Sequence, residues 1–426
     1  MLTATRRVLL MGLAATAAAP LIGCTRPTAA EPKLVSAAGV SRAKPSPDAP
    51  VEAAVEGLIA LGHKVLRAAA EPGRNFVLSP LSLAVAFAMA RVGARGATAQ
   101  ELDAVFGFPA AGRDEAFNAI TSRLVTVDSP PRPDPDENQN RHRTDPPVVS
   151  IGDALFPQKG FPIGADFLRT LAEQYGAGVR PVDFEGDAAG PINAWVDRQT
   201  AGRITKLFDT IPQQTKLVLA NTVYFKADWR RFFTTTADMP FTKADGTRIQ
   251  TATLKDSRRV RYAETGAITA IELAYAEGPY AMWLMLAPPG GQPEDALTSE
   301  VLGRLRDSFT ETAVEIAVPK WAFQNTIELK KVLPGLGLTS AFTLGDADFR
   351  GIAPELFIHD ALQTADISVD EWGTVASAVT GMMMAQSGPP PATARFIADR
   401  PFAFAIVGGE DHIPLFVGRV CDPTAR

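Results

Sequence analysis

The sequence is poor in the residues that build disulfide frameworks and metal sites. It has two cysteines in 426 residues, Cys24 and Cys421, too few for a disulfide framework. Four histidines lie far apart in the chain, and no His-Glu-x-x-His or Cys-x-x-Cys motif occurs. We therefore expect no metal site and no cofactor, and stability must come from packing.

Basic patches and hydrolase motifs are also missing. With 42 Lys plus Arg against 47 Asp plus Glu, the net charge is −5, and no basic run is interleaved with aromatic residues. This composition argues against nucleic acid as a partner. No Gly-x-Ser-x-Gly elbow is present, although a serine hydrolase stays open because catalytic triads are defined by geometry.

Residues 1–24 have the organisation of a signal peptide. Arg6 and Arg7 form a basic start, an apolar stretch follows, and small residues precede Cys24. The stretch is too short to be a membrane span. The run 21–24, Leu-Ile-Gly-Cys, resembles the lipobox of bacterial lipoproteins, so we expect Cys24 to be acylated and the protein to be secreted and anchored to the cell membrane. A chance cysteine in an ordinary leader, and export by either the twin-arginine or the general route, stay open.

With 46% hydrophobic residues, the chain is typical of a globular protein with a sizeable core. Residues 25–52 are rich in Pro, Ala and Ser and predict a flexible tether. Residues 128–147 are rich in Pro and charge and predict a disordered insertion. We expect helices at 51–70, 81–92, 164–175 and 191–208, with Ser79-Pro80 opening the second and a capping box at Thr98-x-x-Glu101 opening another. Strands are expected at 148–156 and 217–226, and they dominate after 268, which indicates an α+β fold with large sheets.

A segment of about twenty residues, 376–395, follows a good strand without a helix or strand pattern of its own, and such long connections are usually functional or disordered. Its first half nevertheless alternates like a strand, because the small residues Thr374, Ala376, Ala378 and Thr380 fall on one face. Residues of this size could enter an existing sheet without overpacking its core. A flexible, alanine-rich lid is the alternative interpretation.

Eight motifs, in order between residues 53 and 424, resemble the signatures of the serpin family. They are Asn75-Phe76-Val77-Leu78-Ser79-Pro80-Leu81-Ser82, Ile192-Asn193-x-Trp195-Val196 with Thr200-x-Gly202-x-Ile204, the central run from Leu217 to Trp229, Val318-Pro319-Lys320-Trp321, Ala347-Asp348-Phe349-x-Gly351-Ile352, Val369-Asp370-Glu371-x-Gly373-Thr374, Ala398-Asp399-Arg400-Pro401-Phe402, and Leu415-Phe416-Val417-Gly418-Arg419-Val420. One such motif is a weak signal, whereas eight in order are specific.

The resemblance implies one domain, 53–424, with three β-sheets, eight or nine helices and an exposed reactive-centre loop at 376–395. It implies an inhibitor of serine-type proteases that acts as a suicide substrate and is not an enzyme. The cut loop inserts as a new strand into the main sheet and traps the acyl-enzyme. A non-inhibitory lipoprotein of the same fold, cleaved only as a substrate, is the alternative.

The resemblance also assigns roles to residues. The hinge of the loop comprises Glu371, Gly373, Thr374, Ala376, Ala378 and Thr380, and Gly373 is expected to let the backbone turn. Ser79, Ser82 and Asn221 match a hydrogen-bonded shutter beneath the sheet, Trp229 matches the aromatic where insertion starts, and Lys320 matches the ion-pair partner of Glu371. Gln363 stands where the family usually has a shutter histidine, so the bonds there must differ.

The resemblance also implies a bait bond about sixteen residues beyond the hinge Glu371 and about fourteen before Pro401, and both counts give Ser387-Gly388. A small serine at this position suits the shallow pocket of elastase-like or subtilisin-like proteases and fits a trypsin-like pocket poorly. Met384 is a second candidate for chymotrypsin-like enzymes. We expect a monomer that contacts the membrane only through its lipid. The sequence does not identify the target protease or its origin.

Overall fold

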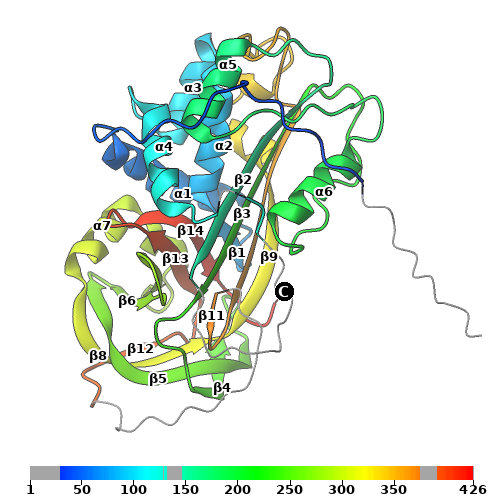
Figure 1. Cartoon of the computed structure of the whole chain (residues 1–426). Helices are drawn as coiled ribbons and strands as arrows, with labels where there is room; N and C mark the ends of the chain where they lie inside the picture. The colour runs from blue at the N-terminus through cyan, green and yellow to red at the C-terminus, as the bar shows by residue number, and fades with distance from the viewer. Residues whose placement is uncertain (1–28, 128, 132–145, 375–390, 426) are drawn as a thin grey trace, which may run out of the picture.

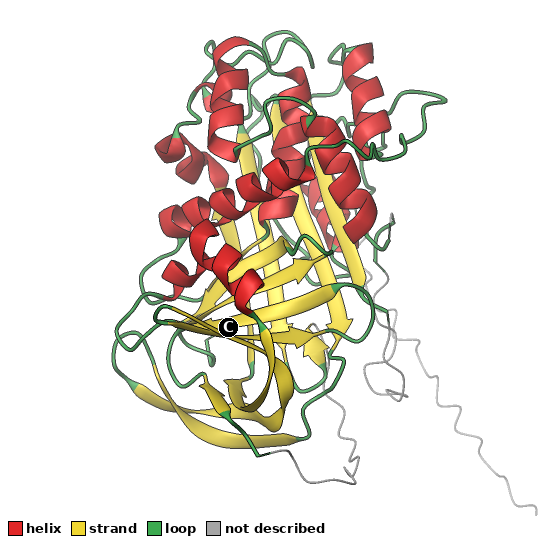
Figure 2. Ribbon diagram, turned by 90° about the vertical axis from the view of Figure 1, so that its left-hand side faces the viewer, coloured by secondary structure: helices red, strands yellow, loops and turns green. Residues whose placement is uncertain are grey.

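The computed structural model describes residues 29–127, 129–131, 146–374 and 391–425. It is an α+β fold in which helices gather at one end and cover large sheets that extend to the other (Figures 1 and 2). The expected signal peptide, nearly all of the insertion and most of the reactive loop lie outside the described residues.

Helices make up most of the first half of the chain. α1 begins at Val51, two residues before the expected start of the domain, and α2 begins at Pro80 after the N-cap Ser79, whose side chain accepts from the Ser82 amide. α2 is buried almost all round, as its sequence predicts. The described helical segments are α1 (Val51–Ala69), α2 (Pro80–Gly93), α3 (Gly96–Phe106), α4 (Arg113–Leu124), α5 (Ala165–Thr170), η1 (Leu171–Tyr175), α6 (Ala189–Gln199), η2 (Pro293–Leu297), α7 (Ser299–Ser308), α8 (Leu329–Val332), η3 (Leu333–Leu336) and η4 (Ser340–Phe342).

Two helix predictions were inaccurate. α3 begins at Gly96, before the expected capping box, and Glu101 instead accepts from the backbone amides of Thr339 and Ser340 at 2.9 and 2.8 Å. The carboxylate therefore satisfies donors at the start of η4, because the segment around 340 packs against α3. α6 ends at Gln199 rather than at 208, and the Thr200 hydroxyl accepts from the Ile204 amide in the turn that follows.

The strands form two hydrogen-bonded sheets. The five-stranded sheet has the order β2-β3-β11-β10-β9, and the nine-stranded sheet has the order β1-β14-β13-β7-β6-β5-β8-β12, with β4 paired to β5. The strands are β1 (Phe76–Leu78), β2 (Val148–Pro157), β3 (Leu217–Asp228), β4 (Thr235–Thr242), β5 (Arg248–Thr265), β6 (Ile268–Ala274), β7 (Tyr280–Leu286), β8 (Thr310–Pro319), β9 (Trp321–Glu328), β10 (Asp360–Val369), β11 (Gly373–Thr374), β12 (Ala394–Ile397), β13 (Phe402–Gly408) and β14 (Ile413–Val420).

Three sheets were expected and two are found, because the long strand β5 joins two of the expected sheets into one nine-stranded sheet. Its first half pairs with β4, its middle with β8, and its last five residues with β6. An 18-residue strand is long enough to run from one layer into the next, so hydrogen bonding continues through it. The larger sheet therefore has two halves. One half contains β8 and β12, and the other contains β6, β7, β13, β14 and β1.

The five-stranded sheet is covered on both faces. A smaller apolar cluster fills the space under α6, where Phe156 and Trp195 meet edge to face at 5.4 Å. The main core fills the other face, beneath α1 and α2, and continues between the sheets. Strands buried on both faces read as nearly continuous apolar runs, as in β3.

Residues 29–50, expected to belong to a flexible tether, lie along the domain as an extended arm. Val35 and Val179 exchange backbone hydrogen bonds of 2.8 and 2.9 Å, and the Arg42 guanidinium donates to the Asn118 side chain at 2.8 Å. The Ala43 amide donates to the Glu173 carbonyl. A Pro- and Ala-rich composition lowers helix and core propensity, but the backbone can still pair with exposed carbonyl and amide groups.

None of the helices within the described ranges combines the length and the apolar character that a membrane crossing requires.

Cys421 is a free, buried thiol, and its burial raises its pKa to about 11.

Candidate functional site

The central strand β3 of the five-stranded sheet changes its neighbour along its length. Val218–Thr222 of β3 pair in parallel with Asp360–Thr364 of β10, and the next neighbour of β3 on this side is β11, at Ala227 and Asp228. The described pairings of β3 on this side thus fall in two stretches, one with β10 and one with β11. Between them β3 and β10 diverge, because β11 lies between the two strands.

The short strand β11 lies where β3 and β10 have diverged, at the end of the sheet away from the helices (Figure 1). Gly373 is opposite Asp228, and Thr374 is opposite both Ala227 and Val369. A Cβ atom on Gly373 would lie 2.2 Å from the Ala227 carbonyl oxygen. Glycine is thus needed here for close backbone approach. The sequence suggested a turning role instead, but the φ of Gly373 is not in the left-handed region.

Thr374 is buried between the strands. Its hydroxyl lies 2.6 Å from the Tyr275 phenol oxygen. The Tyr275 ring stacks on Trp229 with centroids 4.6 Å apart and planes at 9°. Burial raises the pKa of Tyr275, so the phenol is neutral and can donate to or accept from the threonine.

A tight turn joins β10 to β11. Asp370 Oδ1 accepts from the amides of Trp372 and Gly373 at 2.8 and 3.2 Å, a bonding pattern that aspartate commonly makes in turns. Burial raises the pKa of Asp370 to about 6, although the two amide bonds oppose this shift. Trp229 Nε1 donates to the Asp370 carbonyl at 3.0 Å, which connects the turn to the end of β3.

The residues just before β11 are held from two sides. Lys320 Nζ lies 2.7 Å from Glu371 Oε2, with both side chains about a quarter to a third exposed. On the other side, the amides of Trp229 and Phe233 donate to the carbonyls of Trp372 and Glu371. The Phe232 and Trp372 rings meet at 4.9 Å. The segment 229–233 and Lys320 therefore fix the start of the hinge.

A second polar cluster lies beneath the paired part of β3 and β10. The Ser79 amide donates to Gln363 Oε1, and Gln363 Nε2 donates to the Ser79 carbonyl, both at 3.0 Å. Gln363 Nε2 also donates to Asn221 Oδ1 at 2.6 Å. Asn221 Nδ2 donates to Ser82 Oγ at 2.5 Å. The glutamine thus makes a bridge from α2 to β3 across the strand boundary, and all four side chains are buried.

Asp153 of β2 completes this cluster. Its Oδ1 accepts from the Asn221 amide, and its Oδ2 is buried without a hydrogen-bond partner among the described residues. Burial raises the pKa of Asp153 well above its ordinary value, although the bonds from Asn221 and Ser82 oppose this.

The turn after α6 covers the divergent strands. Arg203 Nη2 pairs with Asp366 of β10 at 2.5 Å, and Ile204 is buried against β3. The space between this turn and Val223–Phe225 is only about 10 Å³. An added strand could enter only if α6 and this turn moved away from the sheet.

The structure brings the expected hinge residues Glu371, Gly373 and Thr374 together with Trp229 and Lys320. It separately brings Ser79, Ser82 and Asn221 together with Gln363. Ala376, Ala378, Thr380, Ser387, Gly388 and Cys24 lie outside the described residues, so their assignments stay predictions. Neither Ser79 nor Ser82 bonds to a histidine in the described part of the chain, so neither has the general base of a serine nucleophile.

Sequence reasoning missed Tyr275, Asp153, Phe232 and the Arg203–Asp366 pair. Tyr275 and Asp366 are far in sequence from their partners, and only the packing of the folded chain brings them close. Asp153 could have been noticed, because it is a carboxylate inside an apolar strand pattern at 148–156.

Comparison with known families gives one match over most of the chain. The model described as Serpin (serine protease inhibitor) matches residues 59–423. An uncharacterized serpin-like protein, TK1782, of Thermococcus kodakarensis is 32% identical over 361 residues, covering 82% of this chain and 81% of the relative. The leukocyte elastase inhibitor of Xenopus laevis is 29% identical, covering 82% and 93%.

Solved structures agree on the architecture. The crystal structure of tengpin, a thermophilic serpin in the native state, matches with a TM-score of 0.78 over 89% of this chain and 97% of that chain. Its sequence identity is 24%, so this likeness concerns the fold. It also supports the α+β class that the sequence indicates.

Proposed function

The chain belongs to the serpin family, and we propose that it inhibits a serine-type protease as a suicide substrate. The observation that carries the proposal is the position of Thr374. The first small residue of the alternating segment is already paired between β3 and β10, where these strands diverge. A strand that extended β11 beyond Thr374 would therefore run between β3 and β10.

In the proposed mechanism, the protease serine attacks the carbonyl of the bait bond, the new amine leaves, and an ester acyl-enzyme remains. The freed loop then extends β11 between β3 and β10, toward the helical end of the sheet. Insertion must break the Gln363–Asn221 bond and displace the Arg203–Asp366 cover. The inward positions Ala376, Ala378 and Thr380 are small, which keeps overpacking low as they enter.

We propose Ser387-Gly388 as the bait bond, with Met384 as the competing position. A small serine is best accommodated by elastase-like and subtilisin-like proteases. The likeness to a leukocyte elastase inhibitor is consistent with this preference. Sequencing the cleaved loop decides between the two positions, because a new N-terminus at Gly388 supports Ser387 and one at Ala385 supports Met384.

We also propose that the protein is secreted and anchored through acylated Cys24. The support is the leader sequence. Cys24→Ala should release the protein from membranes or block its processing, and an unmodified mature N-terminus at another residue would exclude the anchor.

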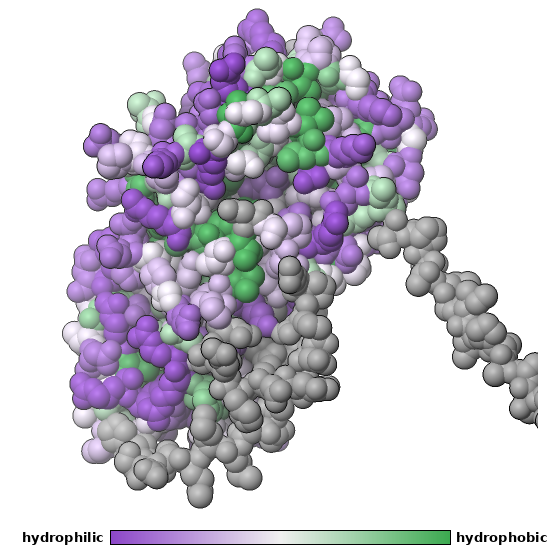
Figure 3. All heavy atoms as spheres, viewed as in Figure 1, coloured by the Kyte–Doolittle hydropathy of each residue, from purple (hydrophilic) through white to green (hydrophobic). Residues whose placement is uncertain are grey.

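A monomer is the proposed state of the folded domain. The face in Figure 3 is largely hydrophilic with scattered apolar clusters. Among the described residues, the large hydrophobic side chains that are exposed are Leu34, Val35 and Leu344. Obligate interfaces need larger continuous apolar areas.

The test of inhibition is incubation of the mature domain with an elastase and with subtilisin, followed by denaturing electrophoresis. An SDS-resistant adduct, with the masses of protease and inhibitor combined, is expected. Cleavage of the loop without an adduct would instead indicate a substrate-only lipoprotein of this fold. Turnover of peptide esters by the protein alone would indicate a hydrolase.

A further inference from the structure

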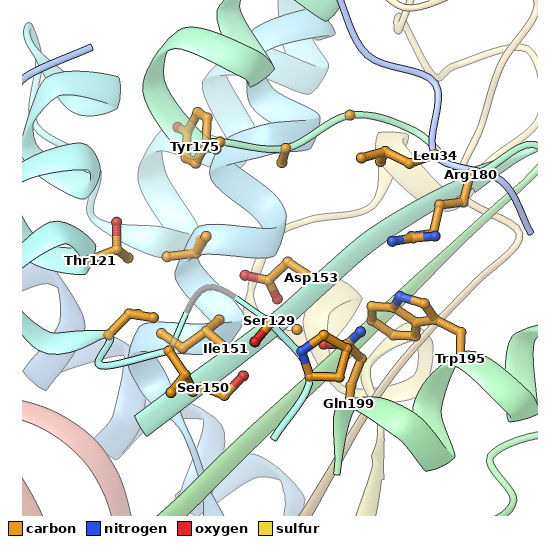
Figure 4. A pocket seen from close by; sticks show the side chains of 18 of the residues that line it. Leu34, Thr121, Ser129, Ser150, Ile151, Asp153, Tyr175, Arg180, Trp195 and Gln199 are labelled. Atoms are coloured by element: carbon orange, nitrogen blue, oxygen red, sulfur yellow. The ribbon is translucent and has the colours of Figure 1, made fainter. Parts of the chain in front are cut away.

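Two arginines are buried among the described residues, Arg258 of β5 and Arg419 of β14, and each is 4% exposed. Other arginines keep more contact with solvent. Arg180, for example, lines the cavity that Figure 4 shows and is only half-buried. A buried guanidinium is costly unless neighbouring groups replace the water that it has lost. The groups around Arg258 therefore show which part of the fold its charge stabilises.

Three groups replace water around the Arg258 side chain. Its Cζ atom lies 4.3 Å from the centre of the Phe233 ring, and its Nη1 donates to the Arg231 carbonyl. Nη1 also lies 3.3 Å from Asp256 Oδ2. Burial lowers the pKa of Arg258 to about 10, although the Asp256 carboxylate opposes this shift. The side chain is thus a cation at neutral pH, and its contacts with the ring and the carbonyl are strengthened by the exclusion of water.

Residues 229–233, which we call the hinge brace, connect Arg258 to the start of the reactive loop. Both ends of the brace donate a backbone bond to the residues just before β11. At its second end, the Phe233 amide donates to the Glu371 carbonyl at 2.8 Å. Phe233 therefore uses its ring to contact Arg258 and its amide to hold Glu371, so a displacement of the ring also displaces the amide.

The hinge brace has little regular structure of its own. Its first residue, Trp229, forms a single bridge with Tyr275, and residues 231–233 belong to no strand. The position of such a segment depends on its side-chain contacts, because it lacks the cooperative bonding of a sheet. Arg258 supplies these contacts from β5 of the nine-stranded sheet, on the side of the brace away from the hinge. The brace thus links the two sheets through one buried cation.

We propose that Arg258 is a positioning residue for the hinge of the reactive loop, which it holds through the Arg231 carbonyl and the Phe233 ring. Its importance for inhibition rests on the proposed suicide-substrate function, because only that mechanism requires Thr374 to stay between β3 and β10 until the loop is cut. The hold on the hinge is a property of the uncut protein and is measurable without a protease.

The experiment compares hydrogen exchange in the unmodified mature protein and in Arg258→Met, where a flexible apolar side chain replaces the cation. Peptides that cover residues 229–233 and 371–374 should exchange about tenfold faster in the variant, as the loss of a bond to a charged group predicts. Arg258→Lys should restore most of the protection, because an ammonium group can still lie over the Phe233 ring. The number of inhibitor molecules consumed per protease trapped should rise in Arg258→Met and return toward normal in Arg258→Lys.

Arg419→Met is the matched control. Arg419 is as buried as Arg258, pairs with Glu294 at 2.9 Å and donates to the backbone carbonyls of Glu71 and Arg74. None of these partners belongs to the hinge or to the hinge brace. The variant should therefore lose a similar amount of thermal stability and keep normal exchange at the hinge.

A second variant, Phe233→Leu, removes the ring and keeps the cation, and it should speed exchange in the same two peptides. Normal hinge exchange in both Arg258→Met and Phe233→Leu, or an equal increase in Arg419→Met, would overturn the proposal. Faster exchange with an unchanged inhibition stoichiometry would support the hold and overturn its importance for trapping. If the unmodified protein forms no adduct with any protease, the proposed function fails, while the exchange comparison still decides whether Arg258 holds the hinge.

Discussion

The hydroxyl of Thr374 and the phenol of Tyr275 lie 2.6 Å apart, buried at the β11 end of the five-stranded sheet. Tyr275 follows β6 of the other sheet and stacks on Trp229, at the end of β3. This contact joins the start of the reactive loop to both sheets. It also keeps Thr374 buried in the uncut chain, so that in the proposed mechanism the first residue of the added strand is already in place.

Removal of the phenol should loosen the hinge. Tyr275→Phe leaves the buried Thr374 hydroxyl without its partner, at a cost of about 1–3 kcal/mol. We expect faster hydrogen exchange at the Gly373 and Thr374 amides and a larger number of inhibitor molecules consumed per protease trapped. Exchange mass spectrometry and titration of residual protease activity measure the two effects.

Tyr280→Phe is a matched control, because the Tyr280 phenol donates to the Leu124 carbonyl at 2.8 Å, away from the hinge. It should lower stability to a similar extent and leave the inhibition stoichiometry unchanged. Equal changes in stoichiometry for both variants would show that the inhibition stoichiometry depends on overall stability and not on the contact between Tyr275 and Thr374.

Substitution of Thr374 itself should separate cleavage from trapping. Thr374→Arg places a charge where the side chain is 2% exposed, and burial of an unpaired charge is strongly unfavourable. We expect the loop to be cut at a normal rate with little or no adduct. An adduct yield equal to that of the unmodified protein would contradict strand addition at this position.

The bridge made by Gln363 should stabilise the closed sheet. Gln363→Ala removes bonds to both backbone groups of Ser79 and to Asn221, all of them buried. We expect a clear fall in the melting temperature, since unsatisfied buried groups cost about 1–3 kcal/mol each. Gln324→Ala, on an exposed position of the adjacent β9, should change it little, and an equal fall in both would contradict a specific role for Gln363.

The hinge turn should respond to pH through Asp370. Its pKa is raised from 3.8 to about 6, so the folded state holds the proton more tightly than the unfolded chain. The resulting stabilisation is full below pH 4 and is lost as pH rises toward 6 and above. Asp370→Asn, whose side-chain oxygen can still accept from both amides, should remove this dependence, on the order of 3 kcal/mol across the range.

Melting temperatures at a fixed scan rate between pH 4 and pH 7 provide the measurement. The difference between the unmodified protein and Asp370→Asn should change by several degrees across this interval. Asp346→Asn, an exposed carboxylate, serves as the reference. Parallel curves for all three proteins would contradict a raised pKa at the hinge.

Local patterns in the sequence were sufficient for most elements. Ser79-Pro80 gave the start of α2, and the apolar runs 148–156 and 217–226 gave β2 and β3 within two residues at either end. The Thr98-x-x-Glu101 capping box failed because Glu101 satisfies the amides of a segment about 240 residues later. A capping motif describes only local bonds, and a tertiary contact took its carboxylate.

The candidate site was predictable in its motif residues and not in their partners. Glu371, Gly373 and Asn221 could be assigned because they belong to recognisable motifs. Tyr275 could not be linked to Thr374, because that contact depends on how the two sheets pack. The reason why residue 373 must be glycine is also not visible in the sequence, because it is the close approach of the backbone to the Ala227 carbonyl in the folded sheet.

The most direct test of strand addition is the melting temperature before and after one cut in the reactive loop by a protease that is not trapped. If the freed segment extends β11 between β3 and β10, the cleaved protein should melt tens of degrees higher, because the sheet is then complete. Thr374→Arg, cut in the same way, should show little of this gain. A cleaved, otherwise unmodified protein that melts at or below the temperature of the intact one would contradict the account.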